Sequence, residues 1–210
     1  MPDIEPLGDR ALTIRLGDRM DAGLAALARG LAARLRGIAG VQEAVPGYAT
    51  VTLFYSPAAV DYHTLATTVT PMLTPEPTES ASGAEHVIPV RYDGPDLQDV
   101  AERTGMTVAR VIELHHSRVY TVYLIGFVPG FAYLGELDPA LELPRRDQPR
   151  TRVPAGSVAI AGRQTGIYPL QTAGGWHLIG HTSTPMFDPL ANPPATLAAG
   201  DRVRFVPSSE

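Results

Sequence analysis

The sequence predicts two domains, a small α+β domain at residues 1–80 followed by a mainly β barrel domain at residues 81–210. Two long helical patterns lie in the first part, whereas the later part has short apolar runs and ten prolines between positions 129 and 194. Between them, residues 74–85 are polar, small and proline-bearing, with no hydrophobic periodicity, as in a linker. Short strands punctuated by glycines in the last third are typical of a closed or nearly closed barrel.

The first domain has the pattern strand, helix, strand, strand, helix. Residues 11–16 alternate apolar and polar side chains, as a half-buried strand does. Asp21 is placed to cap a helix that carries leucines on one face and ends at Gly37. The remaining elements are predicted at 41–45, 50–55 and 61–72, where Asp61 begins the second helix. This order favours a small sheet with both helices on one face.

The second domain begins with a predicted strand at 86–92 and two helical segments within 96–117, joined at Gly105 and capped at Thr107. A further strand is predicted at 120–125. The helical spacing is similar to that of a DNA-binding helix-turn-helix. However, the second helix has one arginine, one glutamate and no other side chain suited to base recognition. We therefore interpret the pair as a helical hairpin that covers one end of the barrel.

Composition excludes several kinds of chemistry. All 17 basic residues are arginine, and the chain has neither lysine nor cysteine. This excludes Schiff-base and P-loop lysines, thiolate nucleophiles, cysteine metal sites and disulfides. The net charge of −5 argues against nucleic acid as a partner. An acidic N-terminus and the lack of a long apolar run predict neither a secretory signal nor a membrane span, and hence a cytoplasmic protein.

An aromatic loop follows the strand at 120–125 and is a candidate pocket wall. Its glycines permit a sharp turn and its proline restricts the backbone, so the loop is expected to be rigid. Rigid aromatic loops tend to line pockets, although the same aromatic side chains can equally fill a core. The candidate wall residues are Phe127, Pro129, Gly130, Phe131, Tyr133 and Trp176, of which the lone tryptophan is more typical of a core.

Four arginines interrupted by prolines form the strongest candidate anion site. Planar guanidinium groups bind the paired oxygens of a carboxylate or phosphate, and the prolines are expected to keep the cluster from folding onto local carboxylates. A solvated basic loop and a protein-docking loop are the alternatives. Gln164 and Thr165 lie between two glycines, so their side chains are expected to project from a tight turn toward a ligand. The cluster comprises Arg145, Arg146, Arg150 and Arg152, and Tyr168 is a further candidate.

The histidines offer a candidate acid or base but predict no metal site. His115 and His116 are adjacent on a predicted helix, so they point to diverging faces and cannot share one metal ion. His177 and His181 lie four apart on a predicted strand, which separates them by about 13 Å. His115 or His116 could act as a general acid or base, although a hydrogen-bonded structural histidine is the commoner situation.

Three segments resemble the family of the 5-oxoprolinase B subunit, also known as KipI-like proteins and as allophanate hydrolase subunit 1. They are GFVPGFAYLG, PRRDQPRTRVPAGSVAIAGRQTGIYPL and GGWHLIGHT, with weaker matches at GDRAL near the start and GDRVRF near the end. The resemblance implies an N-terminal α+β domain and a cyclophilin-like β barrel at the C-terminus. The sequence departs from the family pattern at His181, where arginine is commoner.

The resemblance also implies a function. Family members act with the A and C subunits to open the lactam of 5-oxoproline to glutamate at the expense of ATP, which carries Mg²⁺. Others inhibit a sensor histidine kinase, and a related domain belongs to urea carboxylase; these alternatives stay open. We expect this chain to be inactive alone and to share the nucleotide with its partner.

This chemistry suggests roles for the candidate residues. Phosphorylation of the lactam oxygen would prepare the ring carbonyl carbon for attack by water, and arginines would stabilise the phosphoryl oxygens. We hypothesise that Arg145, Arg150 and Arg152 hold the anion. Gln164 and Thr165 would orient the lactam or phosphate, beside an apolar wall formed by the 127–133 loop.

Overall fold

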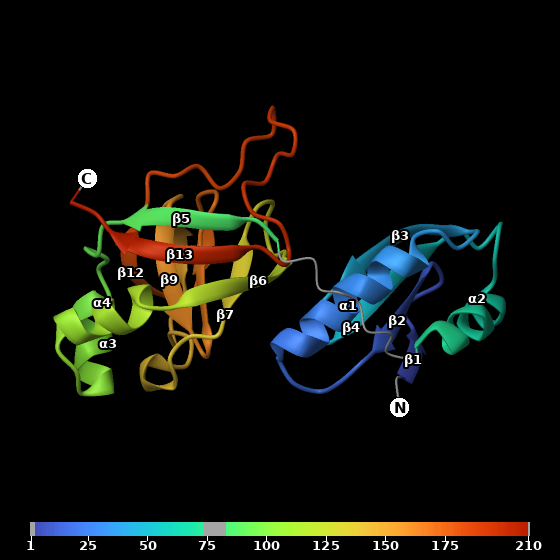
Figure 1. Cartoon of the computed structure of the whole chain (residues 1–210), viewed down its shortest axis with the longest axis horizontal. Helices are drawn as coiled ribbons and strands as arrows, with labels where there is room; N and C mark the ends of the chain where they lie inside the picture. Colours follow the sequence, from blue (N-terminus) through green and yellow to red (C-terminus); the bar gives the residue numbers. More distant parts are fainter. Residues whose placement is uncertain (1–2, 74–82, 210) are drawn as a thin grey trace. The chain divides into compact units, whose positions relative to one another are not determined.

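The structure is a computed structural model that describes residues 3–73 and 83–209 (Figure 1). It divides into two compact units, Met1–Ala81 and Ser82–Glu210. Most of the predicted linker, residues 74–82, lies outside the described residues.

The first unit is a four-stranded antiparallel sheet in the order β1-β2-β4-β3. Its core contains leucine and isoleucine side chains with no exposed surface, including Leu12, Ile14 and Leu53. The strands are β1 (Asp3–Pro6), β2 (Ala11–Arg15), β3 (Val41–Pro46) and β4 (Thr50–Tyr55). The sequence did not predict β1, because this short and acidic edge strand has no clear alternation of apolar and polar residues. Its backbone pairing with β2 defines it as a strand.

Both predicted helix caps of the first unit are confirmed. The Asp21 carboxylate accepts a hydrogen bond from the Leu24 N–H at 3.1 Å at the start of α1 (Ala22–Leu35). Asp61 caps α2 (Tyr62–Val69) in the same way, at 2.9 Å. The α-helix stops before the predicted residue 72 and continues as a 3₁₀ turn, Thr70–Leu73, because a proline at position 71 cannot donate the helical hydrogen bond.

The second unit is built on a curled sheet of seven strands in the order β12-β9-β10-β7-β6-β13-β5. All pairs are antiparallel except β13 with β5. Its edge strands meet at a bridge between Arg91 and His181, whose N–H groups each donate to the other residue's carbonyl at 2.8 Å. The fold is therefore a mixed α/β fold with a curled half-barrel sheet. The strands are β5 (Glu85–Val90), β6 (Val119–Ile125), β7 (Ala132–Gly135), β9 (Ser157–Ala161), β10 (Gln164–Ile167), β12 (His177–His181) and β13 (Arg202–Pro207).

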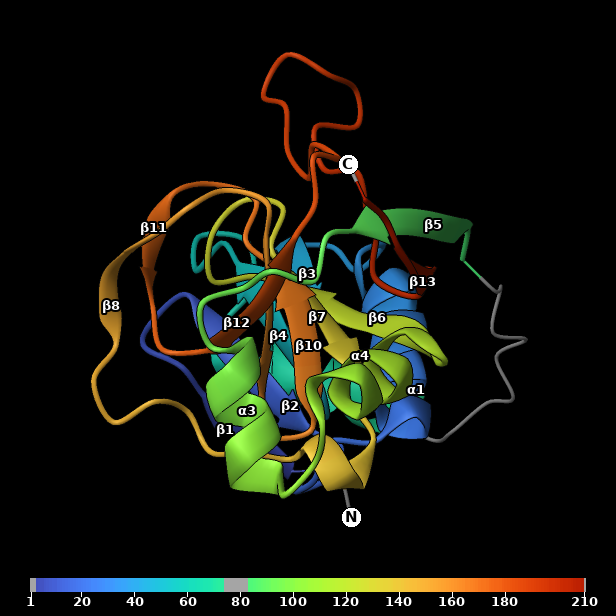
Figure 2. The ribbon, with the colours of Figure 1, turned by 90° about the vertical axis from the view of Figure 1, so that its left-hand side faces the viewer.

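Two helices and a two-stranded ribbon complete this unit (Figure 2). Helices α3 (Leu97–Thr104) and α4 (Val108–His116) form the predicted hairpin, which turns at the left-handed Gly105 and is capped by Thr107. Helix α3 contacts β12, and α4 contacts β13. The ribbon pairs β8 (Arg150–Val153) with β11 (Thr172–Gly174). No helix in the described ranges has the length and apolar character needed to cross a membrane.

Candidate functional site

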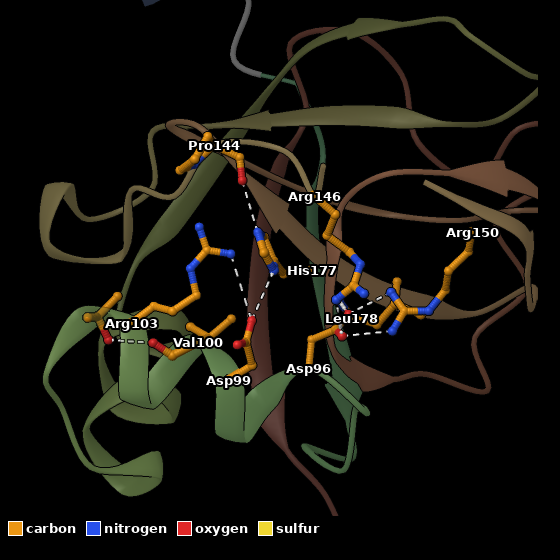
Figure 3. A network of polar contacts seen from close by, with 10 residues as sticks. Asp96, Asp99, Val100, Arg103, Pro144, Arg146, Arg150, His177 and Leu178 are labelled. Carbon is orange, nitrogen blue, oxygen red and sulfur yellow. Dashed lines mark hydrogen bonds and ion pairs between the residues drawn. The ribbon is translucent and has the colours of Figure 1, made fainter. Parts of the chain in front are cut away.

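The arginine cluster is organised by Asp96, a buried residue that immediately precedes α3 (Figure 3). Arg150 binds it through both carboxylate oxygens, at 2.8 Å from Nη1 and 2.7 Å from Nη2. Arg146 Nη1 and the Leu178 N–H each donate to it at 2.7 Å. Burial alone would raise the pKa of Asp96, but the hydrogen bonds from Arg150 and Leu178 and the two arginine charges lower it below its usual value.

The prediction concerned local carboxylates, and two of the four arginines bind a distant one instead. Arg146 and Arg150 turn onto Asp96, which lies 50 and 54 residues earlier in the chain. Prolines restrict only the local backbone, so they do not exclude a contact with a residue that the fold brings near. Sequence reasoning missed Asp96, because an aspartate before a helix resembles an ordinary cap, yet its side chain makes no capping hydrogen bond.

Arg145 is an exposed member of the cluster whose positive charge acts on two tyrosines. Burial raises the pKa of Tyr133, and the positive charge of Arg145 opposes that shift. Tyr168 has a raised pKa for the same first reason, opposed by a hydrogen bond from the Trp176 backbone and by Arg145. Both phenols therefore stay protonated at neutral pH. Arg145 and Arg152, the latter on β8, are thus the two exposed members of the cluster.

The predicted pocket wall divides into core and surface. Phe131 packs edge-on against Tyr133, Tyr168 and Trp176, with ring centroids 4.8, 5.3 and 5.5 Å apart. Phe131, Tyr168 and Trp176 are buried, so they support the site from below and expose little surface to a ligand. Phe127 is 61% exposed and packs against the outside of this aromatic cluster, with its ring centroid 5.7 Å from that of Phe131. Pro129 is also exposed, and Gly130 is buried.

Gln164 and Thr165 do not project from a turn, in contrast to the expectation. The turn consists of Gly162 and Arg163, so Gln164 already pairs with Ala161 at the start of β10. Both side chains are buried. The Thr165 hydroxyl donates to the carbonyl of residue 159 at 3.0 Å, which leaves its oxygen to accept from a histidine.

That histidine is His115, which is completely buried. Because the single Thr165 hydroxyl proton goes to a carbonyl, His115 Nε2 is the donor to Thr165, at 2.8 Å. His115 Nδ1 then accepts from the Tyr92 hydroxyl at 2.7 Å. Burial, with a smaller effect of His116, lowers the pKa of His115 to about 3. His115 thus has the geometry of a structural histidine, whereas His116 is half-buried at the end of α4.

His177 is a second fully buried histidine, and it borders the Asp96 cluster. Its Nε2 donates to the Pro144 carbonyl at 2.9 Å, and its Nδ1 lies 3.9 Å from a carboxylate oxygen of Asp99. These contacts tie β12 to α3 and to the start of the arginine loop. Over residues 3–73 and 83–209, no group of three or more histidine or acidic side chains is arranged to hold a metal ion.

Comparison with known proteins identifies the family. The family described as carboxyltransferase domain, subdomain C and D, matches residues 2–197. The chain belongs to this family. Within it, the 5-oxoprolinase B subunit of Bacillus subtilis (strain 168) is 38% identical over 229 aligned positions, which cover 99% of this chain and 93% of that protein. The resemblance to the 5-oxoprolinase B subunit is therefore confirmed.

Other similar proteins and solved structures match this chain over only part of their length. The 5-oxoprolinase B subunit of Escherichia coli O157:H7 is 56% identical over 126 residues, which are 59% of this chain and 58% of that protein. The crystal structure of TTHA0988 is 42% identical to this chain, with a TM-score of 0.85. The match covers 96% of this chain but only 40% of the TTHA0988 chain. The urea amidolyase of K. lactis, at 18% identity and a TM-score of 0.80, shows the fold alone.

Proposed function

We propose that this chain is the B subunit of an ATP-dependent 5-oxoprolinase, which opens the lactam of 5-oxoproline to L-glutamate together with the A and C subunits. The observation that carries the proposal is the match to the B. subtilis protein along nearly the full length of both chains. A cyclophilin-like barrel for the second unit belongs to the same proposal. The chain is inactive alone, because it contributes part of a shared site.

The reaction adds water across an amide bond that resonance makes unreactive. Transfer of the γ-phosphoryl group of ATP to the lactam oxygen gives an activated ring carbon and releases ADP. Attack by water, cleavage of the carbon–nitrogen bond and loss of phosphate then yield glutamate. Each intermediate carries negative charge on oxygen, and guanidinium groups stabilise such charge without taking part in proton transfer.

Within this proposal the three arginines have different roles. Arg145, which is exposed, is the group that binds the carboxylate or phosphoryl oxygens, with the half-buried Tyr133 as a further candidate donor. The buried Tyr168 supports this site from below. Arg150 contributes positive charge from its fixed position on Asp96, and Arg152 adds a second exposed guanidinium group on β8. Thr165 is not included, because its hydroxyl is buried and already engaged.

ATP and its Mg²⁺ are substrates of the whole complex. This chain has no lysine, so any lysine that contacts the phosphates comes from another polypeptide of the complex. Within this chain only arginine can supply a permanent positive charge to the nucleotide.

Reconstitution tests the proposal. The chain is purified with candidate C and A subunits, and the release of ADP and glutamate from 5-oxoproline, ATP and Mg²⁺ is measured with each polypeptide left out in turn. We expect glutamate only from the full mixture. Arg145→Ala should abolish turnover without preventing assembly, whereas Arg204→Ala, at an exposed position on β13, should not change it. An assembled wild-type complex that releases no glutamate would overturn the proposal.

A further inference from the structure

Two loops of the second unit expose large apolar side chains to solvent. The first loop, residues 126–131, joins β6 to β7 and exposes 61% of Phe127. The second loop, residues 187–195, lies between β12 and β13 and exposes 93% of Leu190, more than any other exposed large apolar side chain of the described residues. Figure 2 shows the second loop projecting well beyond the sheet.

The first loop holds Phe127 in a conformation that its backbone does not favour. Phe127 has φ of +69°, and it is the one non-glycine residue with positive φ in the part of the chain that the structure describes. The loop is closed by a hydrogen bond from the Gly126 N–H to the Phe131 carbonyl at 3.0 Å. Strain of this kind persists where the surrounding structure enforces it, and it accompanies binding sites more often than plain surface.

The second loop is ordered by its own hydrogen bonds. Phe187 and Ala195 form a bridge across its base, and the Asp188 N–H donates to the Pro194 carbonyl at 2.8 Å. The Asp188 carboxylate also accepts from the Leu190 N–H at 2.9 Å. Leu190 is therefore presented from a fixed position, so burying it on a partner costs less ordering entropy.

The first loop packs against the base of the second loop at Phe187. A Cβ atom placed on Gly130 would lie 2.8 Å from the Phe187 Cβ and 3.0 Å from the Met186 carbonyl oxygen. This approach is possible only because residue 130 has no side chain. We call the combined face the apolar loop surface, and it comprises Phe127, Pro129, Phe187 and Leu190.

The apolar loop surface is linked to Tyr133 and Tyr168 through the buried ring of Phe131. The exposed Phe127 ring packs edge-on against Phe131, and Phe131 packs in the same way against Tyr133 and Tyr168. Those two tyrosines are the ones whose hydroxyl groups feel the charge of Arg145. A protein bound to the loops would therefore contact the exposed edge of the aromatic cluster that supports the proposed anion site.

We propose that the apolar loop surface docks a companion polypeptide similar to the part of TTHA0988 that this chain lacks. This chain corresponds to 40% of the TTHA0988 chain, so in that protein a further region is covalently joined to the same fold. Relatives named as a subunit of 5-oxoprolinase have, by that name, separate partner chains. Exposed apolar side chains on ordered loops are typical anchors of such interfaces. The existence of the partner rests on the proposed function, whereas the place where it binds rests on the loops alone.

Binding to the companion chain of the same organism tests the surface directly. Affinity is measured by calorimetry for the wild type, Leu190→Asp, Phe127→Asp and their combination, with Leu7→Asp as the matched control. Leu7 is 54% exposed and lies in the first unit. We expect each loop variant to bind about thirtyfold more weakly, as for an interface anchor, and the control to match the wild type.

Phe127→Gly separates binding from folding. Glycine adopts a φ of +69° without strain, so this variant should be at least as stable as the wild type while it loses affinity for the companion chain. Wild-type affinity in all loop variants would overturn the docking surface and leave the proposed function intact. Failure of the companion chain to bind the wild type would overturn both.

Discussion

Acidification should destabilise the second unit through His115. This ring is fully buried, donates to Thr165 and accepts from Tyr92, so a second proton on Nδ1 would break the hydrogen bond that Nδ1 accepts. Its pKa is lowered from the ordinary 6.5 to about 3, chiefly by burial. Below pH 6.5 the unfolded chain therefore binds a proton that the folded chain does not bind until the pH approaches 3. Stability from this group is complete above pH 6.5 and falls as the pH drops.

The size of the effect follows from the two pKa values. Each pH unit between them lowers the free energy of unfolding by about 1.4 kcal/mol, so the change from pH 7 to pH 5 costs about 2 kcal/mol. Urea unfolding followed by the fluorescence of Trp176 measures this, because the single tryptophan lies buried in the second unit. Other groups that titrate in this pH range change the free energy of unfolding equally in the wild type and in a variant that lacks the His115 ring, so the difference between the two proteins reports His115.

The comparison is between the wild type and His115→Gln, which cannot titrate. We expect the variant to be less stable at pH 7 but to lose about 2 kcal/mol less than the wild type on going to pH 5. His116→Gln, one residue further along α4 and only half-buried, serves as the control and should keep the wild-type dependence. Equal losses in the wild type and His115→Gln would refute the argument that His115 stays neutral.

Three further predictions concern stability. Asp96→Ala leaves two arginines without their carboxylate and should lower the free energy of unfolding by about 3–5 kcal/mol in urea titrations; a loss below about 1 kcal/mol would mean that solvent replaces the carboxylate. Gly174→Ala places a Cβ atom 2.2 Å from the Tyr168 hydroxyl oxygen and should cost about 1–3 kcal/mol in the same assay, whereas an unchanged midpoint would contradict this close approach. A fragment of residues 83–210 should unfold cooperatively at the midpoint of the full chain, as expected if the predicted boundary near residue 80 separates two domains; broad, non-cooperative melting would argue against it.

Local rules predicted much of the fold from sequence. The caps at Asp21, Asp61 and Thr107 each bind a backbone N–H three residues later, so the sequence contains all that is needed to recognise them. The helical hairpin that turns at Gly105 could also be predicted, because its turn and its cap depend on residues close together in the sequence. The sequence predicted a closed or nearly closed barrel only in general terms. It could not predict which residues close the curled sheet, because the bridge joins Arg91 and His181, which are 90 positions apart.

The candidate site was harder to predict from the sequence, because contacts between residues far apart in the chain decide whether each side chain is paired, buried or exposed. Arg145 and Arg150 have the same side chain and similar proline neighbours, yet Arg150 is fixed on Asp96 and Arg145 is exposed. Thr165 was misplaced because its partner His115 lies 50 residues earlier. No local pattern distinguishes such residues, whereas the arginine-rich, glycine-rich segment as a whole was recognisable by its composition.

The fixed arginines and the apolar loop surface together explain why such a site would need a second chain. Asp96 neutralises one of the two guanidinium charges that bind it, so a net positive charge stays near Arg145. In contact with bulk water, an anion 4 Å from a guanidinium group gains about 1 kcal/mol, but at the lower effective dielectric of a covered protein surface it gains about 4 kcal/mol. A partner on the adjoining loops excludes water from this side of the site. Binding of a partner and stabilisation of the anion are therefore coupled, so Phe127→Gly should weaken turnover in the complex although Phe127 does not touch the reacting atoms.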